Sequence, residues 1–367
     1  MTKLRSFFEG LTKRHIWILG CVVFVVLFHL LSGCRPLMNA IATGALWIKR
    51  LLAYVFAVVP VSMMEVIIAA AVIGVVVYII IAVRDIKRST QRWRTLYRRL
   101  SFLIALVLTV YAAFCVLLSA SYYADGFQQK SGLYAQKSSV EELYRVAEYF
   151  GARLGEVYDR VERDENGVFC EDVNEIFEDS TEIYEGVSEI YPFLGQESLK
   201  PKKMLFSWFM SYFNYTGIYF PFSGEANINV HQPSMMIPAT VAHEMAHQRG
   251  IASEQEANFV EILTCMKSGN PVYEYSGAFS AFINLGNALY RYDKEAYSRL
   301  WYSLPPEVLA DMQANNEYWQ QFETKAAEVT EKVYDSFLKS QGQELGVQSY
   351  GACVDLLIAY YNEYGEF

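Results

Sequence analysis

The stretch "TVAHEMAHQRGIASEQEAN" spans residues 240–258 and contains His243 and His247, with Glu244 directly after the first histidine. Residues four apart on a helix lie on one face, about one turn from each other. Two imidazoles at this spacing can bind one zinc ion, and Glu244 can then act as general base toward a water molecule. The stretch therefore predicts a zinc site on a helix. The competing interpretation is a helix that carries two histidines without a metal.

The flanking residues predict where this helix begins and ends. Pro238 in "IPATVA" suits a first helical turn, and Gly250 suits the left-handed residue that often follows the end of a helix. Ser253 and Glu256 have the Ser-x-x-Glu spacing of a capping box, which predicts the start of a second helix. A glycine turn between two helices would let the chain reverse toward the histidines.

A catalytic zinc site has three protein ligands and one open position. The chain has five histidines, of which three lie outside the motif: His15 and His29 in apolar N-terminal stretches, and His231 just upstream. Acids that follow the turn are therefore the alternatives for the third ligand. Glu254 is the first that could swing back, Glu256 is an alternative with a competing role in the cap, and Glu261 lies two turns deeper.

Three stretches are long and apolar enough to cross a bilayer, which requires about 20 apolar residues. They cover residues 16–33, 66–83 and 100–120, so we expect residues 1–121 to form a membrane anchor of three transmembrane helices. Residues 37–60 are also apolar, but Lys49 and Arg50 interrupt them. This segment predicts an amphipathic helix in the membrane interface, with a fourth span as the alternative.

The charges divide the chain at the same place. Residues 1–121 carry 14 Lys and Arg against three acids, whereas the rest carries 17 basic and 37 acidic side chains. Basic residues gather before residue 15 and in residues 84–99, and basic segments stay cytoplasmic. We therefore expect a multi-pass cell-membrane protein with a cytoplasmic N-terminus and an extracytoplasmic domain over residues 122–367.

The expected partners follow from these features. An acidic domain argues against nucleic acid, because phosphate binding needs basic patches. The lipid bilayer and a peptide or protein substrate are the expected partners, and the sequence does not indicate an oligomeric state. Six scattered cysteines without a Cys-x-x-Cys pair argue against a cysteine zinc site.

Helical spacing dominates residues 122–367, which predicts a mainly α domain of the α+β class with a small sheet. Expected helices cover residues 138–162, 171–190, 204–215, 254–268, 271–290, 293–303, 306–340 with a break, and 347–363. "EANINV" (225–230) alternates as a strand does. Resemblance of the motif to zincins implies that this stretch is the edge strand with which an extended peptide substrate pairs, and it makes Asn227 and Asn229 candidate substrate-binding residues; an ordinary strand is the alternative.

A hydrolase of this kind also needs a donor for the oxyanion. Tyr350 in "QSYGAC" is the first candidate, and His231 and Arg249 are the others.

The pattern of His-Glu-x-x-His followed by Glu-x-x-Ala-Asn resembles the gluzincin group of zinc metallopeptidases, which includes membrane-bound prenyl-protein endopeptidases. The resemblance implies a zincin-like fold and makes Glu254 the third zinc ligand. A wider resemblance covers "GIYFPFSGEANIN", "HEMAHQRGIASEQEANF" and "SFLKSQGQELGVQSYGACVDLLIAYY". These stretches are similar to an uncharacterised bacterial family of multi-pass proteins with a zincin-like motif, which implies the architecture but no substrate.

The sequence thus predicts a membrane-anchored zinc metallopeptidase that hydrolyses peptide bonds, with Glu244 as general base. The alternatives are a non-catalytic zinc-binding sensor or assembly factor of the cell envelope, and a structural membrane protein without metal.

Overall fold

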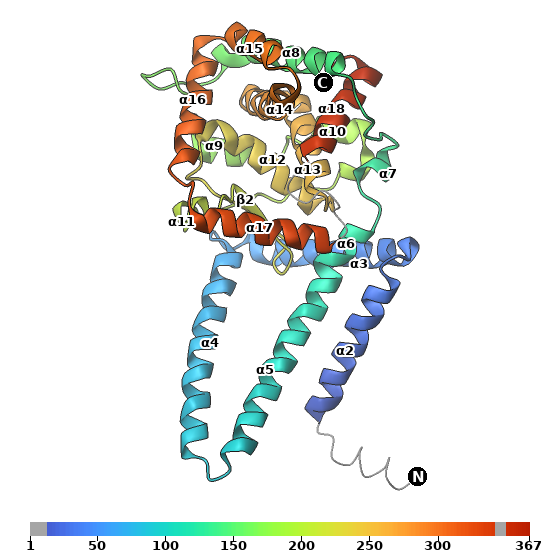
Figure 1. The fold of residues 1–367 in the computed structure, drawn as a ribbon, viewed down its shortest axis with the longest axis vertical. Helices are drawn as coiled ribbons and strands as arrows, with labels where there is room; N and C mark the ends of the chain where they lie inside the picture. Colours follow the sequence, from blue (N-terminus) through green and yellow to red (C-terminus); the bar gives the residue numbers. More distant parts are fainter. Residues whose placement is uncertain (1–12, 342–349) are drawn as a thin grey trace. The chain divides into compact units, whose positions relative to one another are not determined.

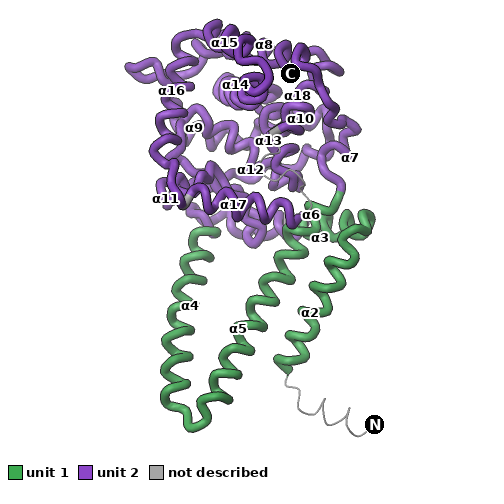
Figure 2. The backbone as a smooth tube through the Cα atoms, viewed as in Figure 1, with its two compact units in different colours: residues 1–45, 64–124 green, residues 46–63, 125–367 purple. Residues whose placement is uncertain are grey.

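The computed structural model describes residues 13–341 and 350–367, and the chain forms two compact units (Figure 1, Figure 2). Unit 1 contains Met1–Ala45 and Met64–Ala124, and unit 2 contains Leu46–Met63 and Asp125–Phe367. The segment Leu46–Met63 thus belongs with the C-terminal unit, although apolar helices flank it on both sides. The predicted domain boundary after residue 121 does not place this segment in the C-terminal unit.

Unit 1 is built from long apolar helices. They are α2 (Lys13–Leu31), the first part of α3 (Arg35–Ala57), α4 (Met63–Arg88) and α5 (Arg92–Phe114), which continues through a short π-helix (Cys115–Ser119) into α6 (Ala120–Tyr123). Within the described residues, four helices are long and apolar enough to cross a membrane, and they indicate membrane association. Two of them contain the predicted spans 66–83 and 100–120, and α2 covers the predicted span 16–33 except its last two residues. The fourth, α3, is the segment for which the sequence leaves two alternatives.

Helices α2 and α5 pack side by side in the same direction. Near their first residues, Arg14 Nη1 donates a hydrogen bond to the carbonyl of Arg98 at 2.8 Å. Toward their other ends, His29 Nε2 and the hydroxyl of Tyr111 are 3.0 Å apart. Lys13 and Arg14 at the start of α2 and the basic residues at the start of α5 therefore lie at the same end of unit 1.

Unit 2 is mainly helical, as predicted. Its helices are α7 (Phe127–Ser131), α8 (Val140–Val157), α9 (Val173–Asp179), α10 (Glu185–Ile190), α11 (Ser207–Ser211), α12 (Ile237–Gln248), α13 (Glu254–Lys267), α14 (Pro271–Tyr292), α15 (Lys294–Ser303), α16 (Pro306–Gln320), α17 (Lys325–Ser340) and α18 (Tyr350–Tyr364).

Two expected helices are shorter in the structure. Residues 171–190 form α9 and α10 with a turn between them, and within residues 204–215 only α11 is α-helical. The second difference has a local cause, because the N–H of Met204 donates to the carbonyl of Ile228 at 3.0 Å and so extends a strand ladder.

The small sheet has three strands: β1 (Lys202–Lys203), β2 (Gly217–Phe220) and β3 (Glu225–Ile228), in the order β1-β3-β2. Strand β3 pairs in parallel with β1 and antiparallel with β2, with Asn227 opposite both Lys202 and Ile218. The expectation that "EANINV" is an edge strand is therefore wrong. Strand β3 is central, with Asn227 and Ile228 paired on both sides. Among the described residues, the strand next to α12 that pairs on one side only is β2.

Helix α12 lies in the middle of unit 2, against α13, α14 and β3 (Figure 1). Its side chains are buried almost all the way round, including Val241, Ala242, Met245 and Ala246. Helix α8 packs on α14, where Phe150 and Phe282 belong to the same core. A short helix enclosed in this way holds its polar side chains in fixed positions, because a close-packed interior leaves few alternative rotamers.

Candidate metal centre

A glycine turn ends α12 and reverses the chain. Gly250 has φ +84°, a left-handed conformation that glycine adopts without steric cost. The N–H of Gly250 donates to the carbonyl of His247 at 3.0 Å, and the N–H of Ile251 donates to the carbonyl of Ala246 at 3.2 Å. This pair of bonds is a Schellman motif. It brings the start of α13 back beside α12, as the sequence predicts.

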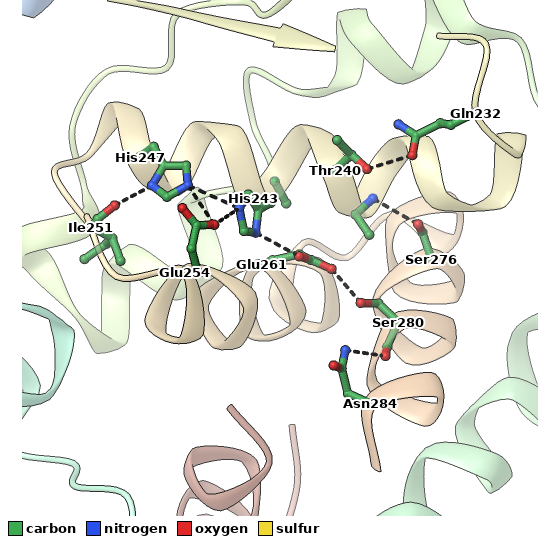
Figure 3. Close-up of polar contacts among 12 residues, drawn as sticks. Gln232, Thr240, His243, His247, Ile251, Glu254, Glu261, Ser276, Ser280 and Asn284 are labelled. Atoms are coloured by element: carbon green, nitrogen blue, oxygen red, sulfur yellow. Dashed lines mark hydrogen bonds and ion pairs between the residues drawn. The ribbon is translucent and has the colours of Figure 1, made fainter. Parts of the chain in front are cut away.

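The turn brings three potential metal ligands together (Figure 3). His243 Nε2 and His247 Nε2 are 3.2 Å apart. Glu254 Oε2 lies 3.3 Å from the first of these nitrogens and 3.7 Å from the second. Among the described residues, His243, His247 and Glu254 form the one group of His, Cys, Asp or Glu side chains whose ligand atoms all lie within 4.8 Å of one another. Two imidazoles and one carboxylate are a donor set that zinc accepts.

The other ring nitrogen of each histidine is anchored. His247 Nδ1 lies 2.6 Å from the carbonyl of Ile251, which can only accept a hydrogen bond, so Nδ1 carries the hydrogen. His243 Nδ1 lies 3.3 Å from Glu261 Oε2, and the hydroxyl of Ser280 donates to the other oxygen of Glu261 at 2.7 Å. Such outer contacts fix the tautomer and orientation of metal-binding histidines. They leave the Nε2 atoms of both histidines facing each other and Glu254 Oε2.

Glu254 is anchored from a different part of the chain. The hydroxyl of Tyr334, on α17, donates to Glu254 Oε1 at 2.7 Å, while Oε2 faces the histidines. Tyr334 was not among the predicted site residues. The 80 residues that separate it from Glu254 and the many tyrosines of the chain give the sequence no signal for this contact.

The electrostatics of the cluster favour a bound cation. Burial by itself would lower the pKa of His243, but hydrogen bonds to Glu254 and Glu261 hold it well above its usual value. Burial would raise the pKa of Glu254, but the charge of His247 and hydrogen bonds to both histidines hold it well below its usual value. The carboxylate of Glu254 thus stays ionised in a largely buried site, and it attracts positive charge there.

Glu244 lies beside the triad and next to strand β2. It is 4% exposed, and its Oε2 has no hydrogen-bond partner among the described protein groups. Burial raises its pKa to about 7. A Cβ atom added at Gly217 would lie 2.5 Å from Glu244 Oε1, so a residue without a side chain is required there. Glu244 is therefore a buried carboxyl group with unused hydrogen-bonding capacity, directly after a candidate ligand.

Glu256 has a different role from either predicted one. Its carboxylate accepts hydrogen bonds from the backbone N–H groups of Phe127 at 2.7 Å and Gln128 at 3.1 Å, at the first turn of α7. Ser253 is the N-cap residue of α13 but makes no side-chain capping bond. The predicted Ser253–Glu256 capping box is therefore wrong. Glu256 also lies outside the triad, because its carboxylate binds the free backbone N–H groups at the start of α7.

Asn227 and Asn229 are fully buried and bond to the protein itself. Asn227 donates to the carbonyls of Ile218 and Glu225 and accepts from the hydroxyl of Ser62. Asn229 donates to the hydroxyl of Ser211 and the carbonyl of Tyr215. Both side chains hold the sheet and its neighbouring loops together, so a direct contact with a peptide is not supported.

The structure does not bring His231 and Arg249, two of the predicted oxyanion donors, to the triad. His231 Nδ1 lies 2.8 Å from the hydroxyl of Tyr318. Arg249 is buried, donates to the carbonyls of Leu194 and Met245, and lies 3.5 Å from the centre of the Tyr184 ring. The side chain of Tyr350 is outside the described residues.

Fold and site together define a membrane-associated, mainly helical protein with a candidate His-His-Glu metal centre. Residues 45–358 match the family described as "Protein of unknown function (DUF3810)", and the chain belongs to this family. The predicted resemblance to a family of unknown function with N-terminal apolar helices is thus confirmed. The matched segment begins one residue before unit 2. No curated protein and no solved structure matches the chain.

Proposed function

We propose that the protein is a membrane-anchored, zinc-dependent metallopeptidase. The observation that carries the proposal is the convergence of His243 Nε2, His247 Nε2 and Glu254 Oε2 within 4.8 Å, next to the buried carboxyl group of Glu244. A cluster of buried groups that includes a general base is expected where a hydrolytic reaction takes place. The contact of each Nδ1 atom with an oxygen acceptor also supports the proposal, because such contacts orient histidines that bind a metal.

The residues divide into holding and reacting groups. His243, His247 and Glu254 would hold zinc, which supplies a Lewis acid that polarises a carbonyl and makes water more acidic. Glu244 accepts the proton from the attacking water and passes it to the leaving amine. Its uncommitted Oε2 suits this task, because a proton acceptor must not be occupied by other donors.

Strand β2 offers a place for an extended peptide. Asn229 N–H donates to the carbonyl of Thr216 at 2.9 Å, and antiparallel pairs alternate in their bonding. The backbone groups of Gly217 and Tyr219 therefore point away from β3. A peptide that adds to this edge by main-chain bonds would lie next to Glu244, which touches Gly217.

The proposed setting is the cell membrane, with several spans. The basic residues at the starts of α2 and α5 lie at the same end of unit 1, which supports a common, cytoplasmic side for both. Unit 2 would then lie outside the cytoplasm, where peptide or protein substrates of the envelope are available.

The test compares the full-length protein with Glu244→Gln and with Glu165→Gln, a matched change at an exposed position. We expect all three to bind zinc, and we expect Glu244→Gln alone to lose hydrolysis of denatured envelope proteins by about 100-fold or more. Unchanged hydrolysis in Glu244→Gln would remove this residue from the mechanism. Stoichiometric zinc without any hydrolysis by the unmodified protein would favour a non-catalytic sensor or assembly factor.

A further inference from the structure

The second half of α3, which belongs to unit 2, is amphipathic. One side packs into unit 2, with Lys49 at 2% and Ala53 at 5% exposure. The opposite side and the first residue after the helix carry apolar side chains at helical spacing with large exposed fractions: Trp47 (69%), Leu51 (65%), Val55 (56%) and Val58 (85%). A soluble surface rarely leaves such a continuous apolar stripe open.

The packed side of this half-helix makes polar contacts within unit 2. Arg50 Nη1 donates to Gln196 Oε1 at 3.2 Å, and the hydroxyl of Tyr54 donates to the carboxylate of Glu197. These groups would have to enter hydrocarbon if residues 46–57 crossed a bilayer, at a large cost in free energy. The geometry favours a helix that lies in the interface, with its polar side on protein and its apolar side outward.

A second exposed apolar cluster adjoins this stripe. Leu205, Phe206, Trp208 and Phe209 are 52% to 70% exposed and directly follow β1. The ammonium group of Lys202, on β1, donates to the carbonyl of Ala57 at 3.3 Å and also to that of Val59, which places the cluster beside the end of α3. Tryptophan and phenylalanine next to lysine are typical of segments that insert into the headgroup region of a membrane.

We propose that these two elements form one surface, here called the interfacial face, that inserts into the outer part of a lipid bilayer. It consists of Trp47, Leu51, Val55 and Val58 together with Leu205, Phe206, Trp208 and Phe209. Chain continuity identifies the bilayer as the occupant, because the apolar helix α4 begins at Met63, only five residues after Val58. The face is thereby tethered to the membrane surface.

The interfacial face lies close to the metal centre. Lys49 Nζ is 5.3 Å from the centre of the Tyr219 ring, and this ring stacks on that of His247 with 6.3 Å between their centres. One side chain of strand β2 thus separates α3 from a candidate ligand. Resting on the proposed function, this placement makes the substrates peptide segments that are held at the membrane surface.

The test uses the full chain in lipid nanodiscs whose lipids are brominated near the headgroup end of the acyl chains, which quench nearby tryptophans. Three single variants, Trp47→Phe, Trp208→Phe and Trp301→Phe, are compared; Trp301 lies on α15, outside the interfacial face. Loss of Trp47 or Trp208 is expected to lower the quenched fraction of the total fluorescence, and loss of Trp301 to raise it.

Two results would overturn the proposal. If aqueous acrylamide quenches Trp47 and Trp208 while brominated lipid does not, the face is open to water. If neither reagent reaches them, protein covers the face. The substrate consequence has its own readout: a lipid-anchored peptide in the same nanodisc should be cut about tenfold faster than the free peptide at equal bulk concentration. Equal, measurable rates for the two peptides would contradict the preference for membrane-held substrates and would not affect the quenching result. If neither peptide were cut, the result would count against the proposed peptidase function.

Discussion

The histidines of unit 1 and those of α12 show what distinguishes a potential ligand from an ordinary polar side chain. On α2, His15 is partly exposed and His29 is exposed, and each uses Nε2 in a contact with a tyrosine hydroxyl, at 2.6 and 3.0 Å. On α12, Nδ1 of each histidine contacts an oxygen acceptor, and Nε2 points toward the partner histidine and Glu254. The difference teaches that the nitrogen left facing other potential ligands, and not the residue type alone, marks a candidate metal ligand.

The largest effect is expected from removing a ligand. Glu254→Ala should abolish stoichiometric zinc binding by the full chain, because two imidazoles remain where zinc needs three protein ligands. Glu256→Ala is the matched control two residues away. It should keep zinc and lower the free energy of unfolding by about 1–3 kcal/mol, since one buried and one partly buried backbone N–H group lose their acceptor.

Elemental analysis and denaturant unfolding measure these two outcomes. Zinc loss in Glu256→Ala with zinc retained in Glu254→Ala would exchange the roles of the two residues.

The second effect concerns the anchor of His243. Glu261→Gln should weaken zinc binding by about 10- to 100-fold, the usual loss when an outer partner of a ligand is changed. Ser280→Ala, which removes the donor to Glu261, should weaken it less. Competition with a chelator of known affinity measures both. An unchanged affinity in Glu261→Gln would mean that the contact at His243 Nδ1 has no role in binding.

A smaller effect is expected at Tyr334. Tyr334→Phe removes one hydrogen bond to Glu254 Oε1 and should weaken zinc binding by about tenfold or less, in line with roughly 1 kcal/mol for such a bond. Tyr302→Phe, at an exposed position on α15, serves as the control. If Tyr334→Phe removed zinc altogether, the hydroxyl would be more than an anchor of Glu254.

The smallest expected effect is a difference in stability between alanine substitutions at two glycines. Gly250→Ala should destabilise the fold by about 1 kcal/mol or more, because alanine is strained at φ +84°. Gly155→Ala should instead stabilise by about 0.5–1 kcal/mol, because Gly155 is in helix α8 and a Cβ atom there meets nothing within 4 Å. Thermal unfolding compares the two. Equal shifts would show that the turn after α12 tolerates a side chain.

Local signals predicted the parts of the fold that depend on neighbours in sequence. Helical spacing, Pro238 and Gly250 located α12, its end and the turn. Contacts between distant segments escaped prediction: the pairing of β1 with β3, which made β3 central, and the use of Glu256 at α7. The residues of the site also differ in whether the sequence near the motif indicates them. Glu254 follows the motif closely, whereas Tyr334 and Ser280 come from helices that only the tertiary fold brings near.

The most direct test of the central claim is zinc K-edge X-ray absorption on the purified full chain. A His-His-Glu site predicts one zinc per chain with nitrogen and oxygen ligands at about 2.0–2.2 Å and the outer scattering of two imidazole rings. Sulfur ligands at about 2.3 Å, or a chain that binds no zinc, would contradict it.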